Sequence, residues 1–302
     1  MDVVVSARIA DCSRSLAATL IHNHSIRVNQ SAAKPGHRLK SGDVVDGEIP
    51  SPEPVDYAPE DIPLDFLYQD HDLAVINKPA GMVVHPAPGN YTGTLVNALL
   101  YHCPDIGRIG SDIRPGIVHR LDKDTSGVMV AAKNSRAHED LSSQFKDRSI
   151  KKEYLAVVHG KMADKSGSIE LPIGRHRTQR KKMSTLSRAG RNAETLWRVA
   201  RQYAGFTLLR LDLKTGRTHQ IRVHCVALQH PVVGDPLYGG RRSTTIPGNV
   251  PDKVRLLLQN VKRQMLHARR LTFRHPTSGE SLTFEAPIPD DMQTLMDALK
   301  GK

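Results

Sequence analysis

The densest concentration of reactive side chains lies between residues 114 and 127, which read Arg-Pro-Gly-Ile-Val-His-Arg-Leu-Asp-Lys-Asp-Thr-Ser-Gly. A short apolar segment ends in this charged loop, and a second apolar segment begins at Gly127. Loops at strand ends are where rigid scaffolds present reactive groups. A carboxylate such as Asp122 can act there as a general base or as a nucleophile, although an ordinary charged surface turn has a similar composition.

Part of this loop is similar to a phosphatase signature. The segment Asp122-Lys123-Asp124-Thr125 resembles the Asp-x-Asp-x-Thr motif of haloacid-dehalogenase-type phosphatases, which bind magnesium through such aspartates. That motif directly follows an apolar strand, whereas His119 and Arg120 intervene here. The downstream acidic pair, Asp290 and Asp291, follows a proline near the chain end. The phosphatase interpretation therefore fits only part of the segment.

The whole string resembles the signature His-Arg-Leu-Asp-x-x-Thr-Ser-Gly of the RluA family of pseudouridine synthases. Other motifs of that family follow in the expected order: residues 76–86 (Ile-Asn-Lys-Pro-Ala-Gly-Met-Val-Val-His-Pro), 152–156, 215–224, 230–231, 234–235, 238–239 and 266–268. The resemblance covers about residues 62–290, and an ordered series of this length makes coincidence implausible.

The resemblance implies that the protein isomerises uridine to pseudouridine in RNA without a cofactor or a metal. It assigns the essential carboxylate to Asp122 and leaves the choice between base and nucleophile open. Arg222 would be the cation that keeps Asp122 ionised and oriented. Tyr154 would place its ring against the target uracil, with its hydroxyl within reach of the proton on carbon 5.

The remaining candidate residues concern the RNA. The target base must leave its helix or loop to reach a buried carboxylate, and the resemblance gives Arg120 a part in displacing it. We expect His119, next to it, to be a structural hydrogen-bonding group. Basic residues that could bind phosphates are found in the run 175–182, in the motif 215–224 and near the N-terminus: Arg175, Lys181, Arg217 and Arg14. His219 and His224 are poorly spaced for one helical face, so we do not expect them to form a metal site.

Composition agrees with a nucleic-acid partner. The 302 residues include 43 Lys and Arg against 31 Asp and Glu, which gives a net charge of +12 and favours polyanions. Aromatic residues make up only 4%, so base stacking would depend on one or two chosen rings. Three widely separated cysteines, no membrane-spanning run and no signal-peptide layout predict a soluble cytoplasmic protein, which we expect to be a monomer.

The chain is expected to comprise three parts. Residues 1–50 resemble an S4-type RNA-binding domain through Ser13-Arg14-Ser15, the strand 26–30 and Gly42-Asp43, but His24 and Gln30 stand where that family has glycine. A left-handed backbone would favour glycine at both turns. Residues 51–63, rich in proline and acids, are predicted to be a linker, and residues 64–302 the catalytic domain.

The catalytic domain is predicted to have an α+β fold, with a mixed, mainly antiparallel sheet and an RNA-binding cleft. Strands are expected at 66–68, 73–76, 127–132, 154–158, 209–213, 271–273 and 282–284, and helices at 95–101 and 137–145, because of their apolar spacing. Thr218 is expected to cap a helix that buries Ile221 and Cys225. Similarity to the RluD group indicates large-subunit ribosomal RNA as the substrate. The alternatives are a tRNA-directed enzyme and a non-catalytic RNA-binding ribosome-assembly factor.

Overall fold

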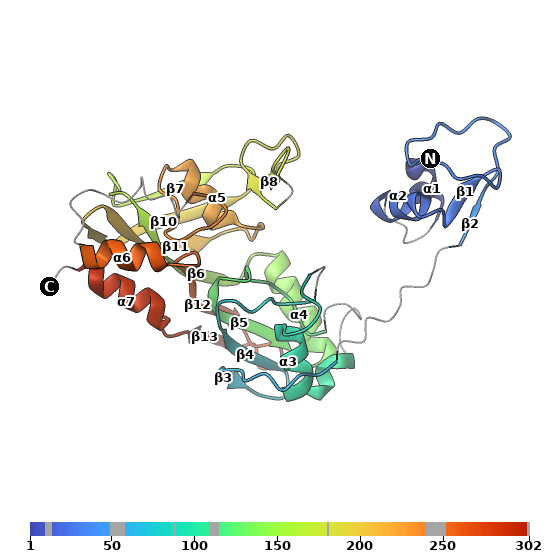
Figure 1. Ribbon diagram of the computed structural model, residues 1–302. Coiled ribbons are helices and arrows are strands. Elements are labelled where there is room, and N and C mark those ends of the chain that lie inside the picture. The colour runs from blue at the N-terminus through green and yellow to red at the C-terminus, as the bar shows by residue number, and fades with distance from the viewer. Residues whose placement is uncertain are drawn as a thin grey trace. The chain divides into compact units, whose positions relative to one another are not determined.

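The computed structural model describes residues 1–9, 14–48, 58–86, 89–108, 115–179, 181–239 and 252–300, without the side chains of residues 14–16. The chain divides into two compact units, residues 1–55 and residues 56–302, each with its own core (Figure 1). Among the residues described, no helix combines the length and the apolar character needed to cross a bilayer.

The first unit is a small α/β arrangement. Its elements are helices α1 (Asp2–Arg8) and α2 (Arg14–His22) and the antiparallel strands β1 (Ile26–Val28) and β2 (Val45–Gly47). His24 and Gln30, at the expected glycine positions, have φ angles of 63° and 62°. The turns therefore have the predicted left-handed backbone, which non-glycine residues adopt only at an energetic cost.

The second unit is built on one nine-stranded sheet. Its strands are ordered β3-β4-β5-β12-β6-β11-β10-β7, and β13 pairs with β12. All of these pairings are antiparallel except that of β12 with β5. The strands are β3 (Phe66–Gln69), β4 (Leu73–Lys78), β5 (Ser126–Ala132), β6 (Lys151–His159), β7 (Ser166–Glu170), β10 (Glu194–Tyr203), β11 (Phe206–Leu213), β12 (Leu266–Arg274) and β13 (Ser281–Glu285). The predicted α+β fold with a mixed, mainly antiparallel sheet is confirmed.

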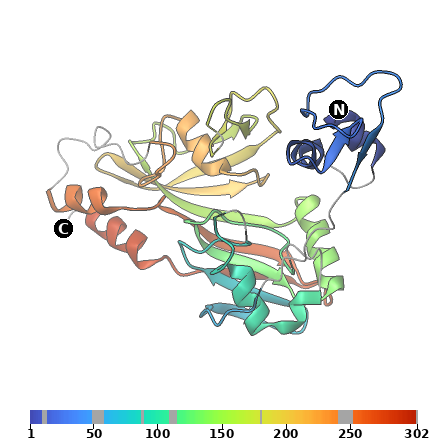
Figure 2. The same ribbon diagram turned by 45° about the vertical axis from the view of Figure 1, so that its right-hand side comes forward.

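Helices cover this sheet and a separate hairpin extends from it. The helices are α3 (Leu95–His102), the 3-10 turn η1 (Pro104–Arg108), α4 (Ser135–Lys146), α5 (Gln220–Ala227), α6 (Asp252–Asn260) and α7 (Asp290–Leu299). The hairpin consists of β8 (Gly174–Arg175) and β9 (Met183–Ser184). Figures 1 and 2 show α6 and α7 side by side at one end of the sheet, with α3 and α4 toward the other.

Alternation along the central strand β6 decides what each sheet face contacts. Tyr154, Ala156 and Val158 belong to a buried cluster that includes residues of α3 and α5. Leu155 and Val157 belong to another cluster, with residues of α6 and α7. Since successive side chains of a strand point to opposite faces, Tyr154 is fixed on the α3 and α5 face.

The end of the predicted linker packs against the second unit. Asn97 of α3 donates a side-chain hydrogen bond to the carbonyl of Ala58, and the Glu60 amide donates to the carbonyl of Asn97. The His102 ring also lies 2.9 Å from the carbonyl of Ile62. Residues 58–62 are therefore part of the sheet unit rather than a free connection.

Candidate active site

The loop that contains Asp122 is held in place by hydrogen bonds to its backbone carbonyls. Within residues 122–125, the Thr125 amide donates to the carbonyl of Asp122 at 3.0 Å. The next two carbonyls accept from Lys78 Nζ at 3.1 Å and from Arg263 Nη1 at 3.2 Å. Since these donors come from β4 and from the segment before β12, separate parts of the sheet position the carboxylate.

Lys78 is the buried part of this support. Its side chain is 0% exposed, and Nζ also donates to the carbonyls of Pro79 and Met82, at 2.7 and 2.9 Å. Burial lowers the pKa of Lys78 to about 7, against the opposing charges of Asp124 and Asp122. The motif 76–86 is thus tied directly to the Asp122 loop.

Gly127 lets the strand after the loop approach β12 closely. It pairs with Ala268 in the parallel ladder and has a φ of 116°. A Cβ at this position would lie 2.2 Å from the Ala268 carbonyl oxygen. Only glycine fits, so the Thr-Ser-Gly end of the motif has a steric reason.

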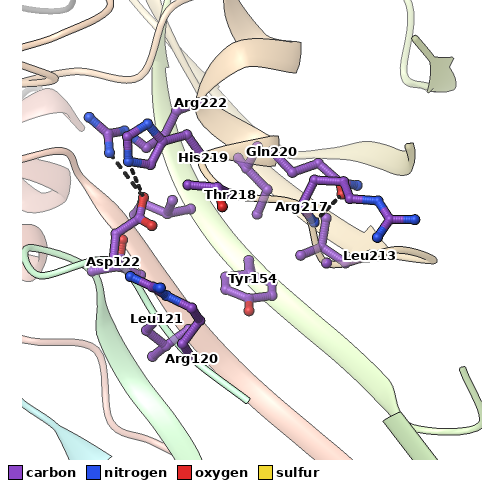
Figure 3. Close-up of a pocket in the computed structure, with 14 residues that line it drawn as sticks. Arg120, Leu121, Asp122, Tyr154, Leu213, Arg217, Thr218, His219, Gln220 and Arg222 are labelled. Carbon is purple, nitrogen blue, oxygen red and sulfur yellow. Dashed lines mark hydrogen bonds and ion pairs between the residues drawn. The ribbon is translucent and has the colours of Figure 1, made fainter. Parts of the chain in front are cut away.

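Asp122 is paired with a buried arginine. Arg222 Nη1 donates to Asp122 Oδ2 at 2.9 Å, and the Arg222 side chain is only 4% exposed (Figure 3). Its Nε and Nη2 donate to the two carboxylate oxygens of Asp235, at 2.7 and 2.9 Å. Although burial disfavours the charged guanidinium, its contacts with Asp235 and Asp122 raise the pKa of Arg222 above its ordinary value. Arg222 is therefore a fixed cation between two carboxylates.

His219 lies on the same side of Asp122. Its Nε2 is 3.9 Å from Asp122 Oδ2, and its Nδ1 is 2.8 Å from the Tyr238 hydroxyl. That hydroxyl already accepts from the Met183 amide at 2.8 Å, so its own hydrogen is available for Nδ1. Burial lowers the pKa of His219 against the opposing charge of Asp122. The network favours a neutral ring whose Nε2–H faces Asp122.

Tyr154 lies on β6, across from the Asp122 loop (Figure 3). Its side chain is 9% exposed, and burial, followed by the charge of Asp122, raises the pKa of Tyr154. The hydroxyl is therefore neutral at ordinary pH. Both residues line one pocket together with Arg120, Arg217, His219 and Arg222.

Other sequence-predicted residues lie in different surroundings. His119 accepts the Val130 amide at 3.0 Å, and its ring stacks on Phe145 at 4.5 Å. Burial lowers the pKa of His119 to about 3, so the ring is a neutral acceptor. Arg175 and Lys181 are exposed on and beside the β8–β9 hairpin and do not line the pocket. Arg14 begins α2, and its side chain lies outside the described residues.

One local prediction was wrong. Thr218 does not cap α5; His219 occupies the N-cap position with a φ of 56° and no side-chain cap bond. The helix buries Ile221 and Cys225 as expected. The left-handed residue turns the chain into the helix and places the His219 ring over the pocket, which apolar spacing alone does not reveal.

Sequence reasoning also missed four functional candidates. The sequence indicated Asp235 and Tyr238 only as members of short family motifs, and Lys78 only as part of the motif 76–86. His219 was named only within the motif 215–224 and was rejected as a metal ligand. Lys78 and His219 contact the Asp122 loop, whereas Asp235 and Tyr238 contact Arg222 and His219. These contacts depend on packing between distant parts of the chain, which residue spacing does not report.

Comparisons with known proteins agree with this geometry. A family model described as RNA pseudouridylate synthase matches residues 72–227. The chain is 43% identical to an uncharacterized RNA pseudouridine synthase, YlyB, of Bacillus subtilis, covering 99% of this chain and 94% of that protein. It is 42% identical to the ribosomal large subunit pseudouridine synthase D of Vibrio vulnificus, covering 99% and 90%.

Solved structures give the same assignment. Human RNA Pseudouridylate Synthase Domain Containing 4 aligns with a TM-score of 0.61 and 26% identity, over 78% of this chain and 93% of that one. Human RNA Pseudouridylate Synthase Domain Containing 1 aligns with a TM-score of 0.57 and 28% identity, over 80% and 96%. The family match decides against the phosphatase alternative. The chain belongs to the RNA pseudouridylate synthase family, as its RluA-type motifs predicted.

Proposed function

We propose that this enzyme isomerises specific uridines of large-subunit ribosomal RNA, with Asp122 as the catalytic carboxylate. The catalytic role of Asp122 is supported by one observation: Nη1 of the buried Arg222 lies 2.9 Å from Asp122 Oδ2, in a pocket that Tyr154 also lines. The substrate part is supported by relatives 42% identical over nearly the whole chain, whose names specify the ribosomal large subunit.

The reaction breaks the bond between uracil N1 and ribose C1′ and forms one between C5 and C1′. Carbon 5 loses its proton and N1 gains one, so the isomerisation is balanced without an external reagent. Asp122 would begin it either by removing a sugar proton or by attacking as a nucleophile. Both roles require a carboxylate held in a fixed orientation, which the hydrogen bond from Arg222 Nη1 to Asp122 Oδ2 provides.

The neighbouring residues would divide the remaining work. Arg222, aligned by Asp235, would orient Asp122, and His219 would present a second donor toward the same oxygen. Tyr154 would hold the uracil ring by stacking during its rotation and offer its hydroxyl to the proton of carbon 5. Arg120, exposed at the pocket rim, would help to displace the base.

The first unit and the β8–β9 hairpin would contribute affinity rather than chemistry. We propose that residues 1–50 are an S4-like RNA-binding module, including Arg14. Arg175 and Lys181 would bind phosphates from the hairpin, because both side chains are exposed. Such contacts position RNA without reading its sequence.

The test is turnover on large-subunit ribosomal RNA transcribed in vitro, which carries no modifications. Wild type should form pseudouridine at a few positions, and Asp122→Asn should form none while it binds the RNA with near-normal affinity. Turnover by Asp122→Asn would remove Asp122 from the mechanism. Turnover of transfer RNA in place of ribosomal RNA would overturn the substrate assignment, and binding without turnover of any RNA would favour the assembly-factor alternative.

A further inference from the structure

A second groove opens beside the active-site pocket of the sheet unit. The two share five lining residues: Arg120, Tyr154, Leu213, Gly216 and Arg217. From this shared rim the groove extends over the end of α4 and the start of β6. A strand of RNA whose target base occupies the pocket can therefore continue into it.

Cations dominate the lining of this groove, and none of its described lining residues is Asp or Glu. Arg120 and Arg217 come from the shared rim, and the groove adds Lys146, Arg148, Lys152 and Arg191. Across the described part of the chain, none of these six forms an ion pair with a carboxylate. Asp147, which lies between Lys146 and Arg148 in sequence, accepts a hydrogen bond from Ser143 and is not among the described lining residues.

These cations also act on one another. Burial and the charge of Arg148 lower the pKa of Lys152, and burial with Arg191 and Arg148 lowers the pKa of Arg217. Since surface cations are ordinarily interspersed with acids, crowding of this kind is unfavourable in the free protein. An anion entering the groove would relieve the repulsion.

The rings in the groove are already occupied. The ring of Phe145 stacks on that of His119, with 4.5 Å between the ring centroids. Lys152 Nζ lies 5.9 Å from the centroid of the Phe145 ring. Tyr154 faces the pocket as well as the groove. Since none of the rings described in the groove is left free for a flanking base to stack on, the groove fits a charged backbone better than a base.

We propose that this groove binds the backbone phosphates of nucleotides adjacent to the target uridine, with Lys146, Arg148, Lys152 and Arg191 as contact residues. The proposal rests on the proposed function, because it assumes that the target uridine occupies the neighbouring pocket. Its effect is to hold the strand while the base is turned inside the pocket. These contacts favour RNA over a neutral ligand but select no sequence.

The experiment compares two variants of the full chain, each lacking two positive charges. Arg148→Gln with Arg191→Gln removes two exposed cations of the groove. Lys253→Gln with Arg201→Gln is the matched control, because it also removes two exposed cations, neither of which lines the groove. Lys253 lies on α6, and Arg201 lies over the ring of Tyr203, which packs in the cluster that includes residues of α6 and α7. Affinity for unmodified large-subunit ribosomal RNA is measured over a range of salt concentrations, and KM and kcat are measured at 0.15 M salt.

A plot of the log of the RNA association constant against log salt concentration should be less steep for the groove variant than for wild type. The slope should differ by about 1.5, because each of the two lost phosphate contacts contributes roughly 0.7 to 0.9. If affinities converge at 1 M salt, that slope predicts about 17-fold weaker binding at 0.15 M. The loss should fall on KM more than on kcat, and the control should match wild type.

Two results would overturn the proposal: a groove variant with the wild-type slope, or a control that loses as much, which would make the effect one of net charge. Failure of the proposed function has a different signature, because wild type would then form no pseudouridine in this RNA whatever the slopes of the variants.

Discussion

Asp235→Asn tests whether the alignment of Arg222 is needed for turnover. The Asp235 carboxylate accepts Nε and Nη2 of Arg222 and the backbone amides of Leu237 and Tyr238. Asparagine has nearly the same volume and keeps one oxygen, which can still accept both backbone amides. Its NH₂ group, however, would face the Nε–H of Arg222, where two donors cannot bond.

The expected cost in stability is moderate, because Arg222 keeps Asp122 as an ionic partner at 2.9 Å. One charge-assisted hydrogen bond is lost, so the free energy of unfolding should fall by about 2 kcal/mol. For a domain of this size, that corresponds to a drop in Tm of about 4 to 8 °C. Activity should suffer more: a guanidinium displaced by about 1 Å would misplace Asp122 and lower kcat about 100-fold.

The assay is tritium release from carbon 5 of labelled uridine in RNA at saturating concentration, together with thermal unfolding. Glu285→Gln is the matched control, since Glu285 also accepts arginine donors, from Arg270 at 2.6 Å and Arg269 at 2.9 Å, at an exposed position on β13. It should cost under about 1 kcal/mol and leave kcat unchanged. Wild-type kcat in Asp235→Asn would refute the view that the Asp235 fork positions Arg222 for catalysis.

Three further outcomes are expected. Tyr154→Phe keeps the ring and should lower kcat about 100-fold at nearly constant KM; near-normal kcat would exclude an essential hydroxyl. Burial lowers the pKa of His267 to about 4, below its ordinary 6.5, so the unfolded chain binds more protons between these values. This histidine should therefore cost about 3 kcal/mol of stability as pH falls from 6.5 to 4, and urea unfolding of His267→Asn should show a flatter acid limb; an identical limb would contradict the assignment. Deleting residues 1–50 should weaken RNA binding more than it lowers kcat, and undiminished affinity would argue against an RNA-binding role for this unit.

Local sequence patterns predicted most of the elements. Alternation along residues 154–158 and 209–213 identified β6 and β11, and the hairpin at 66–76 was confirmed. The order of the strands could not be read in this way. The parallel pairing of β12 with β5 joins residues 267–268 to 126–127, and only the steric need for Gly127 hints at it.

The site was predictable only as far as family motifs reach. Asp122 and Arg222 are 100 residues apart and meet as the resemblance implied. The side chains that position them, Asp235 and Lys78, are set by packing, and a charged residue in a sequence does not reveal its partner. The Nε2–H orientation of His219 depends on a hydroxyl 19 residues away and could not be foreseen.

Whether this protein modifies ribosomal RNA through Asp122 can be decided by mapping pseudouridine in ribosomal RNA from cells that lack the protein. The cells are complemented with wild type, with Asp122→Asn or with an empty vector. We expect a few large-subunit sites to disappear in the deletion strain, to return with wild type and to stay absent with Asp122→Asn. Restoration of those sites by Asp122→Asn, or an unchanged ribosomal map in the deletion strain, would contradict it.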